Sequence, residues 1–456
     1  MTTATTAGQT IVLVGHGMVG HRFLQALAEH GVIRAGGAPG ARVTVLCEEP
    51  RPAYDRVRLT SYFSGTSAQE LSLVEPGFLE RYGIELHTSD PAVAIDRAAR
   101  TVTARSGLTV AYDTLVLATG SYPFVPPVPG RDARGCFVYR TVEDLLAIEE
   151  YARGATTGVV VGGGLLGLEA AGALNGLGLD THVVEFAPRL MPLQVDEGGG
   201  EVLHRAVGDL GVTVHTGVGT QEITTGPDGA VTAMVLSDGS VLKTDLVVFS
   251  AGVRPRDSLA RDCGLPVGER GGIVVDADCR TPDPYVYAIG ECALAADGKV
   301  YGLVAPGYEM AEAAAAGIAG AARGGFTGAD TSTKLKLLGV DVAGFGDAHG
   351  TAPGCLEVLY SDSRTGVYKK LVIGQDGALL GGVLIGDTEA YGMLRPLVGT
   401  APPVPPEQLV LPSGLGAPSA VGPSALPDTA VVCNCHNVTK GAIRAAVTAR
   451  GCAGVP

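Results

Sequence analysis

The stretch that decides the fold is Ile11-Val12-Leu13-Val14-Gly15-His16-Gly17-Met18-Val19-Gly20. Its first four residues form an apolar run that is too short for a helix and leads into glycines spaced as G-x-G-x-x-G. Apolar residues then return at helical spacing from Phe23 to Ala28. The predicted order is therefore a strand, a tight glycine turn and a helix, which is the opening of a βαβ unit.

The same pattern recurs 147 residues later (162 − 15), where Val159–Val161 leads into Gly162-Gly163-Gly164-Leu165-Leu166-Gly167 and then a helix. A later apolar strand closes each unit and ends in a small residue and glycine, at Ala118-Thr119-Gly120 and at Ser250-Ala251-Gly252. One such motif is a weak signal in a chain with 67 glycines, but two in the same context are not. They predict an α/β protein with two Rossmann-like dinucleotide-binding domains.

The glycines of such a turn let a pyrophosphate reach the free N–H groups at the helix N-terminus. In each unit an acidic residue also ends the strand after the helix: Glu48, with Glu49 beside it, and Glu185. Both acids are placed to accept hydrogen bonds from ribose hydroxyls. A carboxylate at Glu185 would repel a 2′-phosphate, which favours NADH over NADPH, whereas the nearby Arg189 is the residue type that an NADPH site presents.

Composition narrows the class of protein further. The 456 residues carry 33 basic and 47 acidic side chains, a net charge of −14 (33 − 47), which argues against nucleic-acid or anionic-membrane partners. No window holds about 18 strongly apolar residues, and Met1–Thr10 does not read as a secretory signal. The nine cysteines are mostly scattered, as expected for reduced thiols in a cytoplasmic protein.

The remaining sequence predicts a smaller domain and a linker. Segments with alternating apolar residues from Thr333 to Asp387 predict a small α+β domain with an antiparallel sheet, and Pro/Ala/Gly/Ser-rich sequence follows it. The predicted boundaries are 1–125 and 251–328 for the first dinucleotide domain, 126–250 for the second, 329–399 for the α+β domain, 400–430 for the linker and 431–456 for the start of a further domain.

These motifs, together with Tyr287-Ala288-Ile289-Gly290-Glu291, resemble the pyridine-nucleotide–disulfide oxidoreductase superfamily, and within it the rubredoxin and ferredoxin reductases. Glu49–Phe63, Gly302–Tyr308 and Lys334–Val340 are similar to the large subunits of assimilatory NADH-dependent nitrite reductases. The resemblance implies FAD in the first unit and NADH in the second. It also implies that Glu291, in place of the usual Asp, holds the flavin ribityl chain, and that the helix starting near Pro306 points at the flavin.

The motifs and the resemblance together assign the cofactor-binding residues. Those for FAD are Gly15, Gly17, Met18, Gly20, Glu48, Glu49, Arg56, Ala118, Thr119, Gly120, Gly290, Glu291 and Pro306. Those for NADH are Gly162, Gly164, Leu165, Gly167, Glu169, Glu185 and Gly252. We expect no acid–base catalyst, because hydride passes directly between the two cofactors.

Cys433-Asn434-Cys435-His436 presents two thiols that form half of a metal site. The segment resembles the start of the [2Fe-2S] domain of bacterioferritin-associated ferredoxins, in which a C-x-x-C supplies the other two ligands. Cys452 is a single cysteine, so the cluster is incomplete in the sequence as given; a zinc site with His436 and an unligated pair are the alternatives. Siroheme and [4Fe-4S] would belong to a further C-terminal half, of which this chain would be either a fragment or a short form.

The sequence therefore supports three hypotheses. The first is an FAD-dependent NADH oxidoreductase that feeds electrons to iron–sulfur and siroheme centres for nitrite reduction to ammonia, with the acceptor in a missing C-terminal half or a small subunit. The second is a self-contained ferredoxin or rubredoxin reductase, or an NADH oxidase. The third is a non-enzymatic nucleotide-binding subunit or redox sensor, which the two intact glycine motifs disfavour. A homodimer is an open alternative to a monomer.

Overall fold

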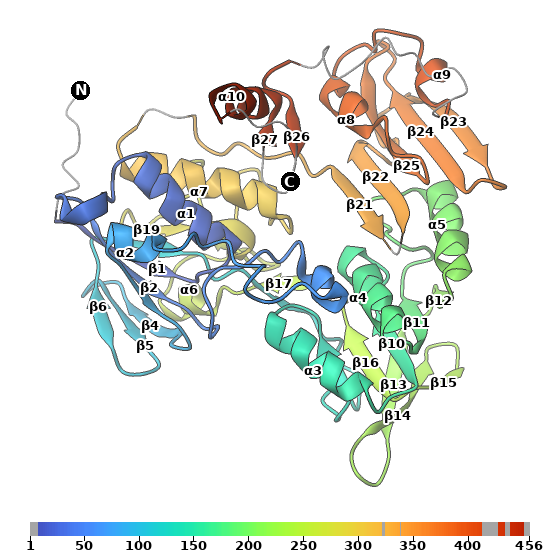
Figure 1. Ribbon diagram of the computed structural model, residues 1–456, viewed down its shortest axis with the longest axis horizontal. Helices are drawn as coiled ribbons and strands as arrows, with labels where there is room; N and C mark the ends of the chain where they lie inside the picture. The colour runs from blue at the N-terminus through green and yellow to red at the C-terminus, as the bar shows by residue number, and fades with distance from the viewer. Residues whose placement is uncertain (1–7, 322–323, 338, 413–426, 434–437, 451–456) are drawn as a thin grey trace. The chain divides into compact units, whose positions relative to one another are not determined.

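The computed structural model describes residues 8–321, 324–337, 339–412, 427–433 and 438–450. Contacts divide the chain into two units, of which the first combines residues 1–122 with 253–330 and the second combines residues 123–252 with 331–456 (Figure 1). The chain thus leaves the first unit after its closing strand and returns to it later. No helix in the described ranges is both long and apolar enough to span a bilayer.

The first unit is built on a five-stranded parallel sheet in the order β19-β7-β1-β2-β3. Its strands are β1 (Thr10–Val14), β2 (Arg42–Leu46), β3 (Ile84–His87), β7 (Thr114–Leu117) and β19 (Val286–Ala288). Helices α1 (Met18–Glu29) and α7 (Val304–Ile318) pack against each other on this sheet. The first unit also contains a separate antiparallel sheet of β4 (Ala92–Asp96), β5 (Thr101–Ala104) and β6 (Thr109–Ala111).

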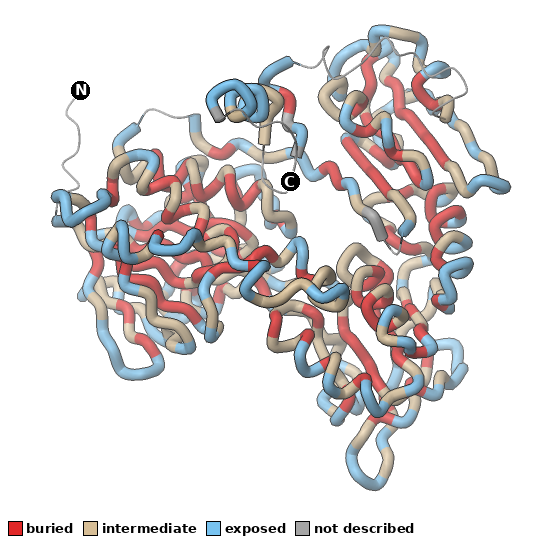
Figure 2. The backbone as a smooth tube through the Cα atoms, in the orientation of Figure 1, coloured by how far each residue is buried: buried red, intermediate tan, exposed pale blue. Residues whose placement is uncertain are grey.

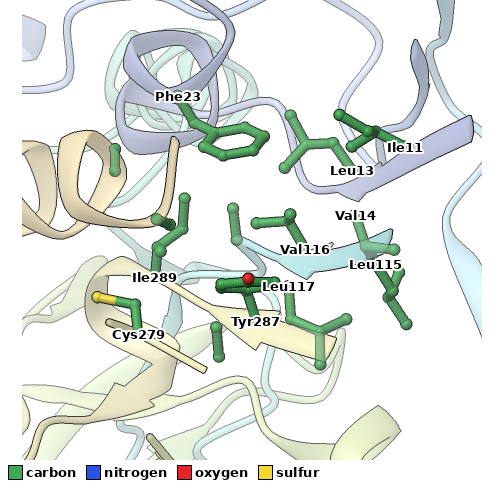
Figure 3. Packing of buried hydrophobic residues seen from close by; sticks show 14 of the residues in the cluster. Ile11, Leu13, Val14, Phe23, Leu115, Val116, Leu117, Cys279, Tyr287 and Ile289 are labelled. Carbon is green, nitrogen blue, oxygen red and sulfur yellow. The ribbon is translucent and has the colours of Figure 1, made fainter. Parts of the chain in front are cut away.

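The core of this unit lies between the sheet and its covering layers. Ile11, Leu13, Phe23 and Val116 are fully buried there (Figure 3). Figure 2 shows the central strands as nearly continuous buried segments. A parallel sheet covered on both faces needs such strands, and burial of each large apolar side chain contributes about 1.5–3 kcal/mol. This explains why the strand before each glycine turn is apolar without alternation.

The second unit repeats the architecture with a parallel sheet in the order β12-β11-β10-β16-β9. Its strands are β9 (Cys136–Val138), β10 (Thr157–Val161), β11 (Asp180–Glu185), β12 (Val212–Thr216) and β16 (Leu246–Phe249). Its helices are α3 (Val142–Ala152), with a capping box of Thr141 and Asp144, α4 (Leu165–Gly176) and α5 (Glu197–Asp209). An antiparallel sheet of β13 (Thr220–Thr225), β14 (Val231–Leu236) and β15 (Val241–Lys243) encloses a second core.

A third sheet belongs to the second unit and is fully antiparallel, in the order β21-β22-β25-β24-β23. Its strands are β21 (Thr333–Leu337), β22 (Val340–Gly346), β23 (Leu356–Asp362), β24 (Val367–Ile373) and β25 (Leu379–Ile385). Helix α5 contacts β12 of the parallel sheet as well as β22, β24 and β25 of the third sheet. The α5 helix therefore joins the two sheets.

Part of the segment that composition predicts as a linker packs on this third sheet. Helix α9 (Pro406–Leu409) forms within it, and Leu409 and Val410 are buried in the core of the third sheet. The packing on the third sheet therefore extends beyond residue 399. The Pro-rich composition does not indicate it, because few apolar side chains make the contact. The later residues 413–426 lie outside the described ranges.

The remaining described elements are short, apart from helix α10 (Lys440–Arg450). They are η1 (Ala35–Gly37), η2 (Leu59–Ser64), α2 (Phe78–Tyr82), β8 (Ser121–Pro123), β17 (Val253–Pro255), α6 (Ser258–Asp262), β18 (Ile273–Val274), η3 (Gly290–Cys292), β20 (Ala293–Leu294), α8 (Tyr391–Leu394), η4 (Arg395–Leu397), β26 (Val431–Cys433), β27 (Val438–Thr439) and α10 (Lys440–Arg450).

Candidate dinucleotide sites

The first glycine turn leaves open space at the start of α1. Gly15 has φ +103°, and a Cβ there would overlap the carbonyl oxygen of Ala118. A Cβ on Gly20 would overlap the carbonyl oxygen of Gly15, whereas a Cβ on Gly17 would meet nothing within 4 Å. Packing of the chain itself therefore requires Gly15 and Gly20. At Gly17 the space beside the helix start stays open, as the approach of a pyrophosphate would require.

The second turn has the same division of roles. A Cβ on Gly162, at φ +116°, would overlap the carbonyl oxygen of Ser250, and one on Gly167 would overlap that of Gly162. Gly164 again faces nothing within 4 Å. Gly17 and Gly164 are the N-caps of α1 and α4, and no side chain in the described residues caps either helix. The first-turn N–H groups of both helices are therefore available to an anion.

Strand pairing brings the residues predicted for FAD to one edge of the first parallel sheet. The N–H of Gly15 donates to Leu46 O at 2.8 Å, and the N–H of Ala118 donates to Val14 O at 2.8 Å. The N–H of Ile289 donates to Leu117 O at 2.9 Å. The strands β1, β2, β7 and β19 thus end side by side. The residues that follow them, which include the predicted acids and the Gly290 turn, therefore lie at the carboxyl edge of the sheet, where α/β proteins bind ligands.

The first turn of α7 lies beside the same glycine turn. A Cβ on Gly307 would meet Val19 Cγ2 at 2.5 Å and Gly290 Cα at 3.4 Å. Pro306, the residue predicted at the flavin, is buried in this first turn. Because only glycine allows so close an approach, α7 begins against both α1 and the Gly290 turn.

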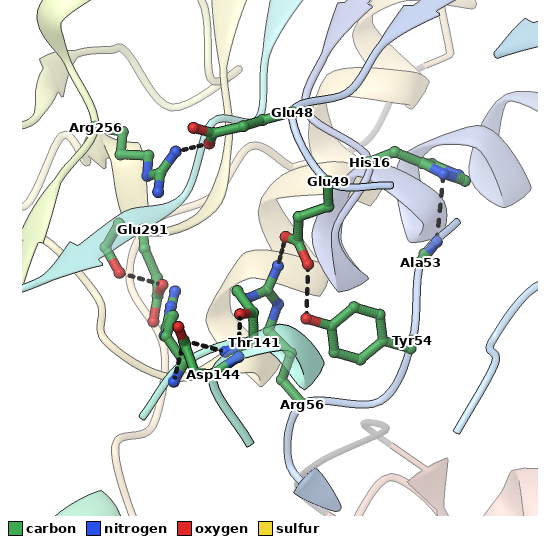
Figure 4. Close-up of polar contacts among 12 residues, drawn as sticks. His16, Glu48, Glu49, Ala53, Tyr54, Arg56, Thr141, Asp144, Arg256 and Glu291 are labelled. Atoms are coloured by element: carbon green, nitrogen blue, oxygen red, sulfur yellow. Dashed lines mark hydrogen bonds and ion pairs between the residues drawn. The ribbon is translucent and has the colours of Figure 1, made fainter. Parts of the chain in front are cut away.

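The two acids after β2 have different partners (Figure 4). Glu48 forms an ion pair with Arg256 and is half-exposed. Glu49 forms an ion pair with Arg56, and its Oε2 accepts a hydrogen bond from the Tyr54 hydroxyl at 2.6 Å. Burial opposes the charge on Arg56, but Glu49 keeps the pKa of Arg56 above its usual value. The Glu49 side chain is 22% exposed and that of Glu48 is 51% exposed, so Glu48 is the more accessible carboxylate for a ribose.

The structure adds three residues to this edge that the sequence motifs do not single out: Ser121, Arg256 and Ala53. Ser121 Oγ donates to Glu291 Oε2 at 2.7 Å, and Thr119 Oγ1 donates to the carbonyl oxygen of Arg256 at 2.6 Å. The backbone N–H of Ala53 donates to His16 Nδ1 at 3.3 Å, which joins the glycine turn to the segment after β2. Ser121 could have been predicted from the sequence, because it directly follows the Ala118–Gly120 motif. Arg256 could not, because it lies 208 residues from its partner Glu48.

In the second unit Glu185 binds the glycine turn directly. Its Oε2 accepts a hydrogen bond from the N–H of Gly163 at 2.6 Å, and its Oε1 accepts one from the N–H of Ala187 at 2.7 Å. A Cβ on Gly163 would lie 3.0 Å from Glu185 Cβ and 2.6 Å from Leu190 Cδ2. Gly163, the middle glycine that the motif leaves unassigned, is therefore needed for this contact.

The other residues predicted for NADH lie around this turn. Leu165 begins α4, Glu169 is half-buried one turn later, and Gly252, at φ +98°, ends the closing segment. Arg189 donates from Nε to Val195 O at 3.1 Å and from Nη2 to Pro192 O at 3.5 Å. Its guanidinium thus supports the loop after Glu185.

The buried cysteines are poor candidates for reactive thiols. Of the six described as free, Cys47, Cys279 and Cys292 are buried, and burial raises the pKa of each. A raised pKa lowers the fraction of the thiolate, which is the reactive form. Of the predicted metal ligands, Cys433 is described only as the end of β26, and Cys435 lies outside the described residues. Within the described ranges, no group of three or more His, Cys, Asp or Glu side chains is arranged to hold a metal ion.

Two parallel sheets, each with a glycine turn that leaves a helix N-terminus open, form the arrangement that is typical of proteins with two dinucleotide sites. The chain belongs to the pyridine nucleotide-disulphide oxidoreductase family, which residues 9–317 match. Residues 332–399 match the C-terminal domain of rubredoxin NAD+ reductases. The chain is thus an FAD- and NAD(H)-dependent oxidoreductase, and the resemblance found in the sequence is confirmed.

Among its relatives, the nitrite reductase [NAD(P)H] large subunit of Klebsiella oxytoca is 55% identical over 96% of this chain and 45% of its own length. The nitrite reductase (NADH) large subunit of Escherichia coli K12 is 52% identical over 97% of this chain and 52% of its own length. The chain spans about half the length of these relatives. The crystal structure of a ferredoxin reductase from Rhodopseudomonas palustris matches with a TM-score of 0.79 and 27% identity, over 91% of this chain and 100% of that one.

Proposed function

We propose that this chain is the electron-entry half of an NADH-dependent nitrite reductase. The observation that carries the binding of two dinucleotides is the pair of open turns at Gly17 and Gly164, where no atom of the described residues lies within 4 Å of a Cβ. The likeness to nitrite reductase large subunits over nearly the whole chain supports the choice of pathway.

In this proposal the first unit holds FAD. The turn from Gly15 to Gly20 offers its N–H groups to the pyrophosphate, and Glu48 accepts from the adenosine ribose. Glu291, held by Ser121, is assigned to the ribityl chain. The N-terminus of α7 faces the same edge, and its dipole favours negative charge on a reduced ring. Met18, Arg56, Ala118, Thr119, Gly120, Gly290 and Pro306 line the remainder of this edge.

The second unit binds NADH in the same way. Gly162, Gly164 and Gly167 shape the pyrophosphate turn, and Glu185 is assigned to the ribose 2′-hydroxyl, which favours NADH over NADPH. Leu165, Glu169 and Gly252 border the nucleotide, with Glu169 assigned to the nicotinamide end. FAD held by these residues would supply acceptance of the NADH hydride and release of single electrons. The chain contributes alignment and exclusion of water, and no side chain needs to exchange a proton with the substrate.

The proposal also includes electron transfer from the flavin to further redox centres. Cys433 and Cys435 are assigned as two ligands of a [2Fe-2S] cluster, because thiolates suit iron–sulfur centres. The other two ligands, and the siroheme and [4Fe-4S] centre where nitrite is reduced to ammonia, would come from the additional length that the relatives have. A second candidate, a self-contained ferredoxin reductase, is favoured by the match to the full length of the Rhodopseudomonas palustris enzyme.

The test compares the chain with an extended form that has the full length of its relatives. We expect the purified chain to be yellow and to reduce ferricyanide with NADH, whereas only the extended form consumes nitrite. Gly164→Val serves as the matched control: it should retain the flavin and lose NADH-driven dye reduction. Rapid reduction of an added ferredoxin, with no nitrite consumption by the extended form, would support the second candidate instead.

A further inference from the structure

The first turn of helix α5 contains three glycines, Gly198, Gly199 and Gly200, although glycine is a poor helix former. Each glycine allows a close approach. A Cβ on Gly198 would lie 2.9 Å from Cε2 of Tyr368, and one on Gly199 would lie 3.2 Å from Cδ1 of Ile385. A Cβ on Gly200 would lie 2.8 Å from Cβ of Arg189. The first turn of α5 is therefore pressed between the third sheet and the loop that follows Glu185.

One carboxylate connects this helix start to the third sheet. Asp196 caps α5 by accepting a hydrogen bond on Oδ1 from the N–H of Gly199 at 3.1 Å. Its Oδ2 lies 2.8 Å from Lys370 Nζ and accepts a hydrogen bond from the Tyr368 hydroxyl at 2.7 Å. Lys370 is only 2% exposed and also contacts Glu357 at 3.1 Å. Burial opposes ionisation of both groups, yet the Lys370 contact helps to hold the pKa of Asp196 below its usual value.

The loop from 186 to 195 continues the connection to the glycine turn. The Arg189 side chain packs against Gly200, and its Nε donates a hydrogen bond to Val195 O, the carbonyl just before Asp196. The N–H of Met191 donates to Gly163 O at 2.9 Å, and Met191 adopts φ +48°, which is unusual for a residue other than glycine. His349 contacts the carbonyl of Leu193 at 3.1 Å from the third-sheet side. An unbroken series of contacts thus runs from Lys370 to Gly163.

We propose that the third sheet positions the pyrophosphate turn of the NADH unit, and that Lys370 is a positioning residue acting through Asp196 and the 186–195 loop. Two packed layers do not require a buried lysine, because apolar side chains would join them at least as well. A buried charge with specific partners instead selects one arrangement of the loop against the turn. This inference rests on the proposed function of the second unit.

Lys369 provides the matched control. It is the neighbour of Lys370 on β24, so its side chain points to the opposite face of the sheet, and it is 1% exposed. It contacts Asp387 at 2.6 Å and the carbonyl of Leu411 at 3.4 Å, away from Asp196. Lys369→Met and Lys370→Met each remove one buried charge from the same strand, but only the second releases the loop.

We expect Lys370→Met to raise the KM for NADH about tenfold, with kcat within about twofold and the flavin content unchanged. Lys369→Met should lower the melting temperature comparably and leave the KM unchanged. Tyr368→Phe, which loses only the hydroxyl, should raise the KM by a smaller factor. Equal changes of KM in the two lysine variants, or no change in Lys370→Met, would overturn the proposal.

Hydrogen exchange tests the same connection without catalysis. Residues 186–195 should exchange about tenfold faster in Lys370→Met than in the parent chain, and should be unaffected by Lys369→Met. If the parent chain did not oxidise NADH, the proposed function would fail while this measurement still stood. Unchanged exchange of the loop in Lys370→Met, in a chain that oxidises NADH, would reject the positioning role alone. If Lys370→Met does not fold, the exchange of Tyr368→Phe decides between the two outcomes.

Discussion

Glu185 accepts a hydrogen bond from the backbone N–H of Gly163 at 2.6 Å, although 22 residues separate them. The carboxylate therefore does not simply end a strand: it holds the middle residue of the glycine turn. Its other oxygen holds the N–H of Ala187, at the start of the loop that follows. Each carboxylate oxygen keeps further acceptor capacity, so the same side chain can support the turn and also bind a ribose hydroxyl.

A change of the Glu185 charge should alter cofactor preference, and a substitution that removes both acceptor oxygens should also loosen the glycine turn. We expect Glu185→Gln, which keeps an acceptor oxygen at the same reach, to lower the NADH/NADPH ratio of kcat/KM about tenfold. Glu185→Arg should lower it about a hundredfold, because a charged hydrogen bond contributes about 1.5–3 kcal/mol and the repulsion of a 2′-phosphate is removed. Steady-state kinetics with both nucleotides measure the ratio.

Glu201→Arg is the control for net charge, since Glu201 is exposed on α5. It changes the charge of the chain as much as Glu185→Arg and should leave the ratio unaltered. If the Glu185 variants had the same ratio as the parent chain, the assignment of this carboxylate to the ribose would be wrong.

The two kinds of glycine in the first turn should respond differently to substitution. Gly17→Val places its side chain in open space at an extended residue (φ −88°), so the FAD-free chain should melt as the parent does but retain no flavin. Gly15→Ala would clash with the carbonyl of Ala118 at φ +103°, and should lower the free energy of unfolding by about 3 kcal/mol or more. Flavin absorbance per chain and thermal melting of FAD-free protein distinguish the two effects.

Gly164→Val supplies the comparison from the second unit, because it has the same open environment. Its flavin content should stay normal. A fully flavin-loaded Gly17→Val protein would contradict the assignment of the first turn to FAD.

The parts of the structure that the sequence predicts well are local. Strand β1 and the start of α1 at Met18 follow from an apolar run, a glycine spacing and a 3.6-residue period that all lie within about 20 residues. The third sheet likewise follows from alternating segments. Element β3 was harder: the alternating Glu85–Thr88 segment does not reveal that it joins the main parallel sheet beside β2.

Contacts between distant segments could not be predicted, because no periodicity links their residues. Asp196 and Tyr368 are 172 residues apart, and Glu48 and Arg256 are 208 apart. A buried lysine also contradicts the usual placement of charge on the surface, so neither Lys369 nor Lys370 is found from composition. The high glycine content correctly indicates that backbone segments approach their neighbours closely. Only the structure shows which neighbour each glycine contacts.

Two buried histidines predict an acid-sensitive first unit. Burial lowers the pKa of His16 to about 3 and that of His21 to about 4, from an ordinary 6.5. Below pH 6.5 the unfolded chain binds protons that the folded chain does not, so the free energy of unfolding falls as the pH falls. From pH 7 to 5 each histidine accounts for about 2 kcal/mol, because 1.5 pH units lie below 6.5 and each is worth about 1.4 kcal/mol.

Urea unfolding at pH 7 and pH 5 measures this loss. His21 packs edge-on against Phe78 with ring centroids 5.3 Å apart, so His21→Phe keeps an aromatic ring there and should remove about half of the pH dependence. His30, exposed at the other end of α1, is the control, and His30→Gln should leave the pH dependence as it is. A His21→Phe chain with the full pH dependence of the parent would show that other groups are responsible.

Two glycines of α5 should have opposite effects on stability when replaced by alanine. A Cβ on Gly208 would meet nothing within 4 Å, so Gly208→Ala should stabilise the chain by about 0.5–1 kcal/mol through helix propensity. A Cβ on Gly198 would press into the Tyr368 ring, at 2.9 Å from Cε2 and 3.0 Å from the hydroxyl oxygen, and should cost about 1–3 kcal/mol. Urea unfolding of the FAD-loaded chains measures both changes. Because the clash acts on the contact between α5 and the third sheet, Tyr368→Ala should make Gly198→Ala nearly neutral; a cost that persists in the double variant would mean that Gly198 is needed for another reason.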